Sequence, residues 1–576
     1  MRRILSQVFG LAWRAVSGPR ALVGIVVYAM ALGLQFFGVW ISVRFIAWNK
    51  DFYDAIEQRD LSTTVEQVWV FFGLVALSAG SYLIGKWLRD KLAIHWRERL
   101  TNKALDVWMA NGAYWHLRPG ASPQSVDNPD QRVAEDCRNF VNKFIEQTLD
   151  LIGSSVALIS YIAILWSLSD YTLRFSIAGM DIALPHYIMW AAFVHVAIST
   201  FATHMLGWPL KQLVFRQERH EADFRYSLIQ IRDSAGEIAQ SGGESAERRR
   251  LNDRFSAIRA NWNRLIGREF ILGLFVRPYF QSILRVPILY ALPAYFGGNT
   301  SFGGLMQLSA AFGRVTQTLS WFIFEYRELA ELAAVTERLD NLFVSAGDPP
   351  PMPGTERAIS RSQSPDAALH VRSLHLSTPQ GRSLLPVPDR SIMPGDRVWI
   401  SGASGQGKST LLAAISGIWL YGRGEIQKPE GSFVYLPQKP HLNGHDIHEA
   451  ATYPRDPADF DRDEIGRVLV RLGLGHRLDA AQDDPGALEG LSAGERQRLA
   501  LARVQLLRPD WIVLDEATSA LDTAAEESIL GMIRRELPGS AILCVSHRAP
   551  EALAPFQIWN IGENHQDTGE LRVRAN

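Results

Sequence analysis

A glycine-rich loop ending in a lysine and a serine lies between an apolar strand and a helix, in RVWISGASGQGKSTLLAAISGIW (397–419). Its residues fit the spacing GxxxxGK[ST], which has meaning only in such a strand–loop–helix setting. Backbone N–H groups of this kind of loop, together with the helix N-terminus, surround a β-phosphate. The lysine would contact the β- and γ-phosphates, and the serine would offer its hydroxyl to Mg²⁺. The residues expected to bind the nucleotide are Gly402, Ser404, Gly405, Gly407, Lys408, Ser409 and Thr410.

Two acidic residues directly follow a second apolar strand, in DWIVLDEATSALD (510–522). Ligands of an open α/β sheet bind at the carboxyl ends of its strands, so these acids are expected to face the nucleotide. Asp515 would hold Mg²⁺ through water, and Glu516 would polarise the attacking water. An acidic strand end alone is equally typical of a solvated turn. After a phosphate loop, we favour the catalytic interpretation.

The stretch LSAGERQRLALAR (491–503) begins with a second loop of small residues. One nucleotide needs only one such loop, so the second loop requires a separate explanation. The order of the two loops, the acidic strand and CVSHR (544–548) is that of the ATP-binding cassette (ABC) ATPases. The chain resembles this family over residues 367–576. The resemblance implies that the second loop, the signature loop, caps ATP held by the phosphate loop of an opposite subunit. It therefore implies ATP and Mg²⁺ as cofactors and a second copy of the chain as partner, in a two-fold dimer.

The same resemblance implies roles for further residues. Gln438, in YLPQKPHL, resembles the glutamine that contacts Mg²⁺ and couples the ATPase to the membrane domain, and His547 resembles the histidine that contacts the γ-phosphate. The expected catalytic residues are Glu516, His547 and Gln438; the metal ligands are Ser409, Gln438 and Asp515; further ATP contacts are Ser492, Gly494, Glu495 and Asp522. The usual aromatic residue that stacks on adenine is missing from LHLSTPQGRSLL (374–385), where His375 and Pro379 are the candidates to replace it.

The N-terminal half contains long apolar segments with few or no charges. Because about 20 apolar residues cross the hydrocarbon core as a helix, we predict six spans, at 21–43, 67–85, 151–169, 182–210, 270–296 and 302–324. Basic residues gather before the first span and after the second and fourth, which places both termini in the cytoplasm. The predicted location is a bacterial inner membrane, with a multi-pass chain and a cytoplasmic ATPase domain.

The predicted architecture is an all-α six-helix transmembrane domain followed by an α/β P-loop ATPase domain. The first covers 1–344, a linker rich in Pro, Ser and Gly covers 345–366, and the second covers 367–576. One phosphate loop and six spans in each chain imply a half-transporter. The charged segment 211–269 is expected to form two helices of roughly 25 residues that extend into the cytoplasm.

Two arginines lie within predicted spans. Arg285 falls in the fifth span and Arg314 near the middle of the sixth. An arginine inside a bilayer is costly, so it usually faces a polar cavity or a partner group. These residues either line a substrate cavity or form structural pairs with other helices, and the sequence leaves both interpretations open.

Motifs of the membrane half narrow the resemblance. NKDFYDAIEQRD (49–60) and NPDQRVAEDC (128–137) resemble the SbmA/BacA-like group of bacterial transporters and the related D subfamily of peroxisomal and lysosomal ABC transporters. This resemblance implies ATP-driven import of a bulky hydrophilic compound, such as cobalamin, bleomycin or an antimicrobial peptide.

Other functions stay open at this point. An exporter of lipid, acyl-CoA or drug would have the same layout. An ATP-gated channel or regulator is the alternative of another class, and Glu516 argues against it because a gate needs no hydrolytic residue. The formal net charge of −1 does not suggest a nucleic-acid partner. The two cysteines, Cys137 and Cys544, lie far apart and suggest neither a disulfide framework nor a zinc site.

Overall fold

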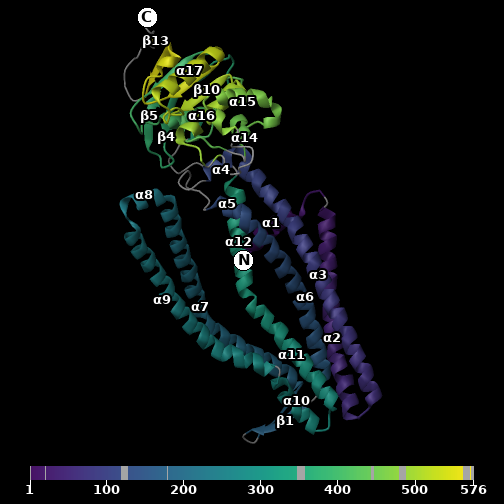
Figure 1. Cartoon of the computed structure of the whole chain (residues 1–576). Helices are drawn as coiled ribbons and strands as arrows, with labels where there is room; N and C mark the ends of the chain where they lie inside the picture. Colours follow the sequence, from purple (N-terminus) through teal and green to yellow (C-terminus); the bar gives the residue numbers. More distant parts are fainter. Residues whose placement is uncertain are drawn as a thin grey trace. The chain divides into compact units, whose positions relative to one another are not determined.

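The chain folds into two units, which are described separately (Figure 1). The structure is a computed structural model that describes residues 2–19, 21–117, 128–170, 172–177, 180–283, 285–346, 357–442, 446–478, 488, 490–561 and 571–572. The first unit comprises Met1–Val107 and Asp130–Val344, and the second comprises Trp108–Pro129 and Ser345–Asn576. A short segment of the N-terminal half, Trp108–Pro129, thus belongs to the second unit.

Helices, most of them long, build most of the first unit. They are α1 (Arg2–Val16), α2 (Ala21–Glu57), α3 (Leu61–Met109), α6 (Cys137–Leu168), α7 (Tyr187–Asp233), α8 (Ala235–Ser241), α9 (Glu244–Ile283), α10 (Val286–Phe296), α11 (Phe302–Phe324) and α12 (Tyr326–Ser345). Four helical segments of the described chain are long and apolar enough to cross a membrane, namely Ala21–Glu57, Leu61–Met109, Pro129–Leu168 and Tyr187–Asp233. They contain the first four predicted spans, except for Ser169 at the end of the third and residues 182–186 at the beginning of the fourth.

The fourth and fifth predicted spans differ from the helices observed. A hairpin of β1 (Thr172–Ile177) and β2 (Met180–Pro185) occupies the beginning of the fourth span, 182–185, because Pro185 disfavours helical backbone at the residue before it. The fifth span, 270–296, is not one helix: α9 ends at Ile283 and α10 begins at Val286. Pro287 explains this break, since its ring would clash with the carbonyl four residues earlier.

The charged segment 211–269 forms two helices, as predicted. α7 continues through it to Asp233, α8 makes the turn, and α9 returns beside α7 (Figure 1). Buried Asn261 of α9 joins the pair by donating from Nδ2 to the Leu213 carbonyl and to Gln217 Oε1 of α7, each over 2.9 Å. This polar contact fixes the register of two helices whose outer faces are charged.

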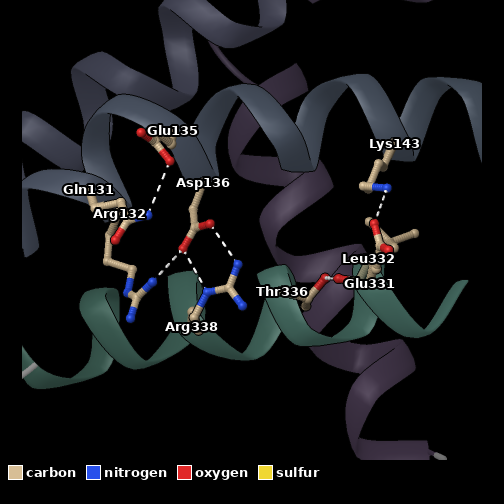
Figure 2. Close-up of polar contacts among 9 residues, drawn as sticks. All are labelled: Gln131, Arg132, Glu135, Asp136, Lys143, Glu331, Leu332, Thr336 and Arg338. Atoms are coloured by element: carbon tan, nitrogen blue, oxygen red, sulfur yellow. Dashed lines mark hydrogen bonds and ion pairs between the residues drawn. The ribbon is translucent and has the colours of Figure 1, made fainter. Parts of the chain in front are cut away.

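Ion pairs connect α6 to α12 (Figure 2). The chain enters α6 through a π-helical turn, Arg132–Asp136, which places Asp136 on the side facing α12. The Asp136 carboxylate accepts hydrogen bonds from Arg338 Nε at 2.9 Å and Nη2 at 2.7 Å, and from Arg132 Nη1 at 3.0 Å. Further along α6, Lys143 Nζ donates to Glu331 Oε2 at 2.8 Å. Two helices that lie far apart in the sequence are therefore joined by charged groups.

Two sheets and several helices form the core of the second unit. The six-stranded sheet has the order β13-β12-β7-β11-β10-β9, parallel except for β13, with β7 (Arg397–Ser401), β9 (Phe433–Leu436), β10 (Trp511–Asp515), β11 (Ala541–Val545), β12 (Phe556–Asn560) and β13 (Leu571–Arg572). The other sheet contains β3 (Arg357–Gln363), β4 (Leu369–Ser377), β5 (Ser383–Val387), β6 (Arg390–Ile392) and β8 (Gly422–Lys428). The helices that position the site are α13 (Lys408–Ser416), α16 (Ala493–Leu507) and α17 (Thr523–Glu536).

Side chains alternate along the central strand β10, which is buried on both faces. Trp511 and Val513 pack into one apolar cluster with residues of α13, whereas Ile512 and Leu514 pack into another with residues of α16 and α17. This arrangement explains the continuous apolar run before Asp515. A helical membrane unit and an α/β unit confirm the predicted fold class.

The predicted linker, 345–366, is partly a strand. Residues 357–363 form β3, which pairs in parallel with β8. β3 lies at the edge of its sheet, and most of its described side chains are exposed, so its sequence lacks the apolar alternation that signals a strand. Residues 347–356 of the linker lie outside the described part of the chain.

Candidate functional site

The phosphate loop follows the carboxyl end of β7, an interior strand of the six-stranded sheet, and leads into α13. Gly402 has a φ of 151°, and a Cβ atom there would lie 2.8 Å from the carbonyl oxygen of Ile561. No side chain fits, which explains the glycine. Lys408 Nζ donates to the carbonyl oxygens of Gly402, at 2.7 Å, and Ala403, at 3.1 Å. The ammonium group is therefore held over the loop that the sequence predicts to bind phosphate.

Ser409, on the first turn of α13, lies against the end of β10. Its Oγ donates to Asp515 Oδ1 at 3.0 Å, and the Tyr435 hydroxyl donates to Asp515 Oδ2 at 3.1 Å. Burial raises the pKa of Asp515, although these hydrogen bonds oppose the shift. Burial, together with this carboxylate, raises the pKa of Tyr435 as well. A hydroxyl and a carboxylate thus meet where the sequence predicts the metal, and oxygen ligands of this kind suit Mg²⁺.

Glu516, the residue after Asp515, lies in contact with Gln438 and His547, the two other predicted catalytic residues. Glu516 Oε2 accepts from Gln438 Nε2 at 2.8 Å, and Glu516 Oε1 lies 3.4 Å from His547 Nε2. The backbone of Glu516 has a φ of 52°, uncommon outside glycine, and its N–H donates to the Val545 carbonyl at 2.9 Å. The neighbouring strand thus holds this strained turn, and the carboxylate lies between two side chains from distant segments.

The signature loop caps its own helix. Ser492 is the N-cap of α16: its Oγ accepts from the Glu495 N–H at 3.2 Å, while Glu495 Oε2 accepts from the Ser492 N–H at 2.8 Å. Arg477, with the Ser492 N–H, holds the pKa of the buried Glu495 carboxyl well below its usual range. The Glu495 side chain therefore serves the cap, and the surface of the loop is made by Ser492 and Ala493.

The loop after Glu516 lies directly behind the signature loop. A Cβ atom at Gly494 would lie 3.1 Å from the carbonyl oxygen of Ala520, so a glycine allows this close approach. Asp522 ends the loop as the N-cap of α17, accepting from the Ala525 N–H at 2.7 Å. In the part of the chain that the structure describes, no hydrogen bond joins Ser492 to the phosphate loop of the same chain.

Gln497 is a residue of this site that the motif assignments missed. It lies on α16, is 4% exposed, and contacts the backbone of both Gln438 and Glu516. The sequence contains one signal for this role: Gln497 is a polar residue at a position of α16 that is buried together with apolar residues of the same helix.

The predicted replacements for an adenine-stacking ring lie on the β4–β5 hairpin. Pro379 is buried, and His375 is half-buried with Nδ1 3.0 Å from the Ser373 carbonyl oxygen. An aromatic residue from another segment reaches the same hairpin, because Trp419 Nε1 donates to the Ser377 carbonyl at 3.0 Å. Trp419 lies downstream of the phosphate loop, outside the segment 374–385 in which the sequence predicts the stacking residue.

The two membrane arginines lie in different surroundings. Arg314 lines a cavity of about 410 Å³ formed by residues of α2, α3, α6 and α11, whose polar lining includes Ser42, Ser78 and Gln317. Arg285 is exposed at the break between α9 and α10 and is not among the lining residues of this cavity. Among the described residues, neither arginine has a carboxylate within salt-bridge distance.

Comparisons with known proteins identify the family to which the chain is similar. Residues 18–294 match the family "ABC transporter transmembrane region 2", and residues 388–519 match the family "ABC transporter". The chain is 32% identical over 540 residues to the Inner membrane ABC transporter ATP-binding protein YddA of Escherichia coli (strain K12), covering 94% of this chain and 92% of that protein. It is 26% identical over 589 residues to the Lysosomal cobalamin transporter ABCD4 of Homo sapiens, covering 94% and 91%.

The fold also matches a solved structure, that of a bacterial Atm1-family ABC exporter with ATP bound. The TM-score is 0.72 at 16% identity, over 95% of each chain, which shows a shared fold. The chain therefore belongs to the ABC transporter family, as a half-transporter whose multi-pass membrane domain is fused to an ATP-hydrolysing domain.

Proposed function

We propose that two copies of this chain form a homodimer with two shared ATP sites and use ATP hydrolysis to import a bulky hydrophilic compound. One observation supports the dimer. Each chain has one phosphate loop and one signature loop, and within the described residues of one chain no hydrogen bond joins these two loops. The signature loop exposes Ser492 and Ala493, and a second copy would supply the phosphate that they cap. Head-to-tail pairing about a two-fold axis completes both sites at once.

In each site, the residues of this chain have distinct roles. Lys408 binds the β- and γ-phosphates from the position that it already holds over the loop. Ser409 and Asp515, with Gln438, would hold Mg²⁺, which when bound balances the charge of the phosphates. The Glu516 carboxylate orients the attacking water and accepts its proton.

Gln438 and His547 keep the Glu516 carboxylate in place. Each contacts a different oxygen of this carboxylate, so its plane is fixed before the nucleotide binds. His547 lies beside the carboxylate that would orient the water, which is consistent with the γ-phosphate contact that the resemblance implies for this histidine. Because Gln438 comes from a different segment than Glu516, movement of either segment would alter the hydrolytic geometry.

The cargo proposal is supported by the polar lining of the membrane-unit cavity and not by its volume, because the 410 Å³ of one chain suits a drug-sized ligand and is smaller than a corrinoid. Helices that are otherwise apolar turn serine, glutamine and arginine side chains toward it, as transmembrane helices do around a polar ligand. Arg314 would attract a phosphate or carboxylate group, which favours a corrinoid over an arginine-rich peptide. The name of ABCD4 states cobalamin transport for that relative. We further propose that the chain lies in a bacterial inner membrane, with both termini and the ATPase domain in the cytoplasm.

Export of a lipid, acyl-CoA or drug is the competing function, and transport in two orientations separates the two. Purified protein is reconstituted in liposomes, with ATP either trapped inside or added outside, and labelled cobalamin or a proline-rich peptide is added outside. Import predicts accumulation only with trapped ATP. Accumulation only with external ATP would establish export instead.

The Arg314 assignment is tested in the same liposomes. Losing a charged hydrogen bond to the cargo should reduce uptake by Arg314→Gln about tenfold. Arg285→Gln is the matched control, because Arg285 lies outside the cavity lining, and its uptake should stay near that of the wild type. Poor membrane expression of the Arg314 variant, rather than altered uptake, would assign Arg314 a structural role.

A further inference from the structure

We propose that Gln497 is a positioning residue that links the signature loop of one ATP site to the catalytic carboxylate of the other, so that the two sites hydrolyse ATP cooperatively. This inference rests on the proposed homodimer. In that dimer, the signature loop of a chain serves the nucleotide held by its partner, whereas Glu516 and Gln438 serve its own. A side chain that joins these two sets within one chain therefore connects the two sites.

The contacts of Gln497 are shared among three functional segments. Its Nε2 lies 3.2 Å from the Gln438 carbonyl oxygen, 3.4 Å from the Glu516 carbonyl oxygen and 3.1 Å from Ser519 Oγ. Its Oε1 accepts from the Ala520 N–H at 2.8 Å. One amide group thus contacts the backbone at both residues of the Gln438–Glu516 pair and the loop that follows Glu516.

Gln497 belongs to the helix that the signature loop begins. Ser492 caps α16, and Gln497 lies little more than one turn further along the same helix. A helix turn moves as a rigid element, so a displacement of Ser492 by the partner's nucleotide would be passed to Gln497. Gly494 reinforces the link, since it packs against the Ala520 carbonyl next to the N–H that Gln497 binds.

Burial makes these hydrogen bonds consequential. Gln497 is 4% exposed, so carbonyl groups that lose it gain little water in exchange. Gln505 provides a contrast on the same helix: it is 5% exposed, and its Nε2 has no hydrogen-bond partner within the described residues. Two buried glutamines of α16 therefore differ in whether their amide groups join catalytic segments.

The test compares Gln497→Met with Gln505→Met in the purified full-length protein. Methionine keeps the length and flexibility of glutamine but makes no comparable hydrogen bonds. We expect kcat of the Gln497 variant to fall about tenfold to a hundredfold, with KM for ATP within about threefold of the wild type, because Lys408 and the phosphate loop are unchanged. The Hill coefficient for ATP should fall toward one. Gln505→Met should change none of these values by more than about twofold.

A second variant guards against a general loss of folding. Gln497→Glu keeps an acceptor for the Ala520 N–H and removes the donor to the Gln438 and Glu516 carbonyls, so it should show the same loss of kcat and of cooperativity. Thermal unfolding and fluorescent-nucleotide binding are measured on both variants. Normal unfolding and binding with low kcat support the proposal. Loss of nucleotide binding, or kcat and a Hill coefficient like those of the wild type, would overturn it.

The dimer is tested separately, by light scattering of the same preparations. A monomer with full ATPase activity would refute the homodimer itself. A dimer whose wild-type Hill coefficient is already one would leave the homodimer standing and refute the link between its two sites.

Discussion

Replacing Asp136 by asparagine should destabilise the membrane unit, because this carboxylate is the buried centre of the charged contacts between α6 and α12 (Figure 2). Its side chain is 4% exposed, whereas those of Arg132 and Arg338 are 12% and 39% exposed. Asparagine preserves the shape but leaves two guanidinium groups next to a neutral amide. The substitution therefore tests the charge rather than the packing.

The magnitude follows from these exposures. Removing one partner of a fully buried ion pair costs about 3–5 kcal/mol. Arg338 is partly exposed and regains water when the carboxylate charge is lost, which reduces the expected cost to about 2–3 kcal/mol. At roughly 2–4 °C per kcal/mol for a large domain, the apparent Tm should fall by about 4–12 °C. Arg338→Gln should cost less, since Arg132 still neutralises Asp136.

The assay is thermal unfolding in detergent, followed by size-exclusion chromatography with fluorescence detection. The control is Arg232→Gln, whose partner is Asp233 in a pair with 76% and 61% exposed side chains; its Tm should be unchanged within error. The double variant Asp136→Asn/Arg338→Gln should lose at least about 1 kcal/mol less than the sum of the single variants. Additive losses, or a Tm for Asp136→Asn equal to that of the control, would show that the charges do not hold the helices together.

Two further predictions concern the ATP site. Glu516→Gln should bind ATP normally but hydrolyse it about 10²–10⁴-fold more slowly, because an amide cannot accept the proton of the attacking water; near-normal turnover of the purified variant would refute the role of Glu516. In mixed dimers of a Lys408→Ala chain and a Ser492→Arg chain, one site has both loops intact while the other carries both lesions. Differentially tagged, purified mixed dimers should therefore regain ATPase activity absent from either parent, and no recovery would count against independent shared sites.

Most of the residues that meet in the candidate ATP site could be named from the sequence, because the spacing that identifies them is local. The phosphate loop needs glycine at a backbone position where Gly402 has a positive φ, and lysine directly before α13, so spacing alone constrains it. Asp515 and Glu516 were predictable because a fully buried strand is recognisable by its apolar run, and its end lies at the ligand edge of the sheet. The structure adds the hydrogen bonds that hold these two carboxylates, from Ser409 and Tyr435 to Asp515 and from Gln438 to Glu516.

Features that depend on distant segments were not predictable. Gln497 is distinguished by its hydrogen bonds to residues far along the chain, which no motif spacing reveals. The edge strand β3 is too polar to show apolar alternation. The break before α10 had a local signal in Pro287, but the apolar composition of 270–296 outweighed it in the prediction of a single span. Composition identifies lipid-compatible residues and does not by itself locate the end of a helix.

The Asp136–Arg338 pair shows why such long-range contacts bear on function. Three peptide connections join the two units, at Val107–Trp108, Pro129–Asp130 and Val344–Ser345. Asp136 follows the connection at Pro129–Asp130 by a few residues, and Arg338 precedes the connection at Val344–Ser345 by a few residues, on helical segments that their ion pair joins. A displacement applied at one of these two connections would therefore be shared by the other. Lys143 and Glu331 repeat the link along the same two helices, and residues of α6 also line the polar cavity, so the charged contacts between α6 and α12 hold a helix that shapes this cavity.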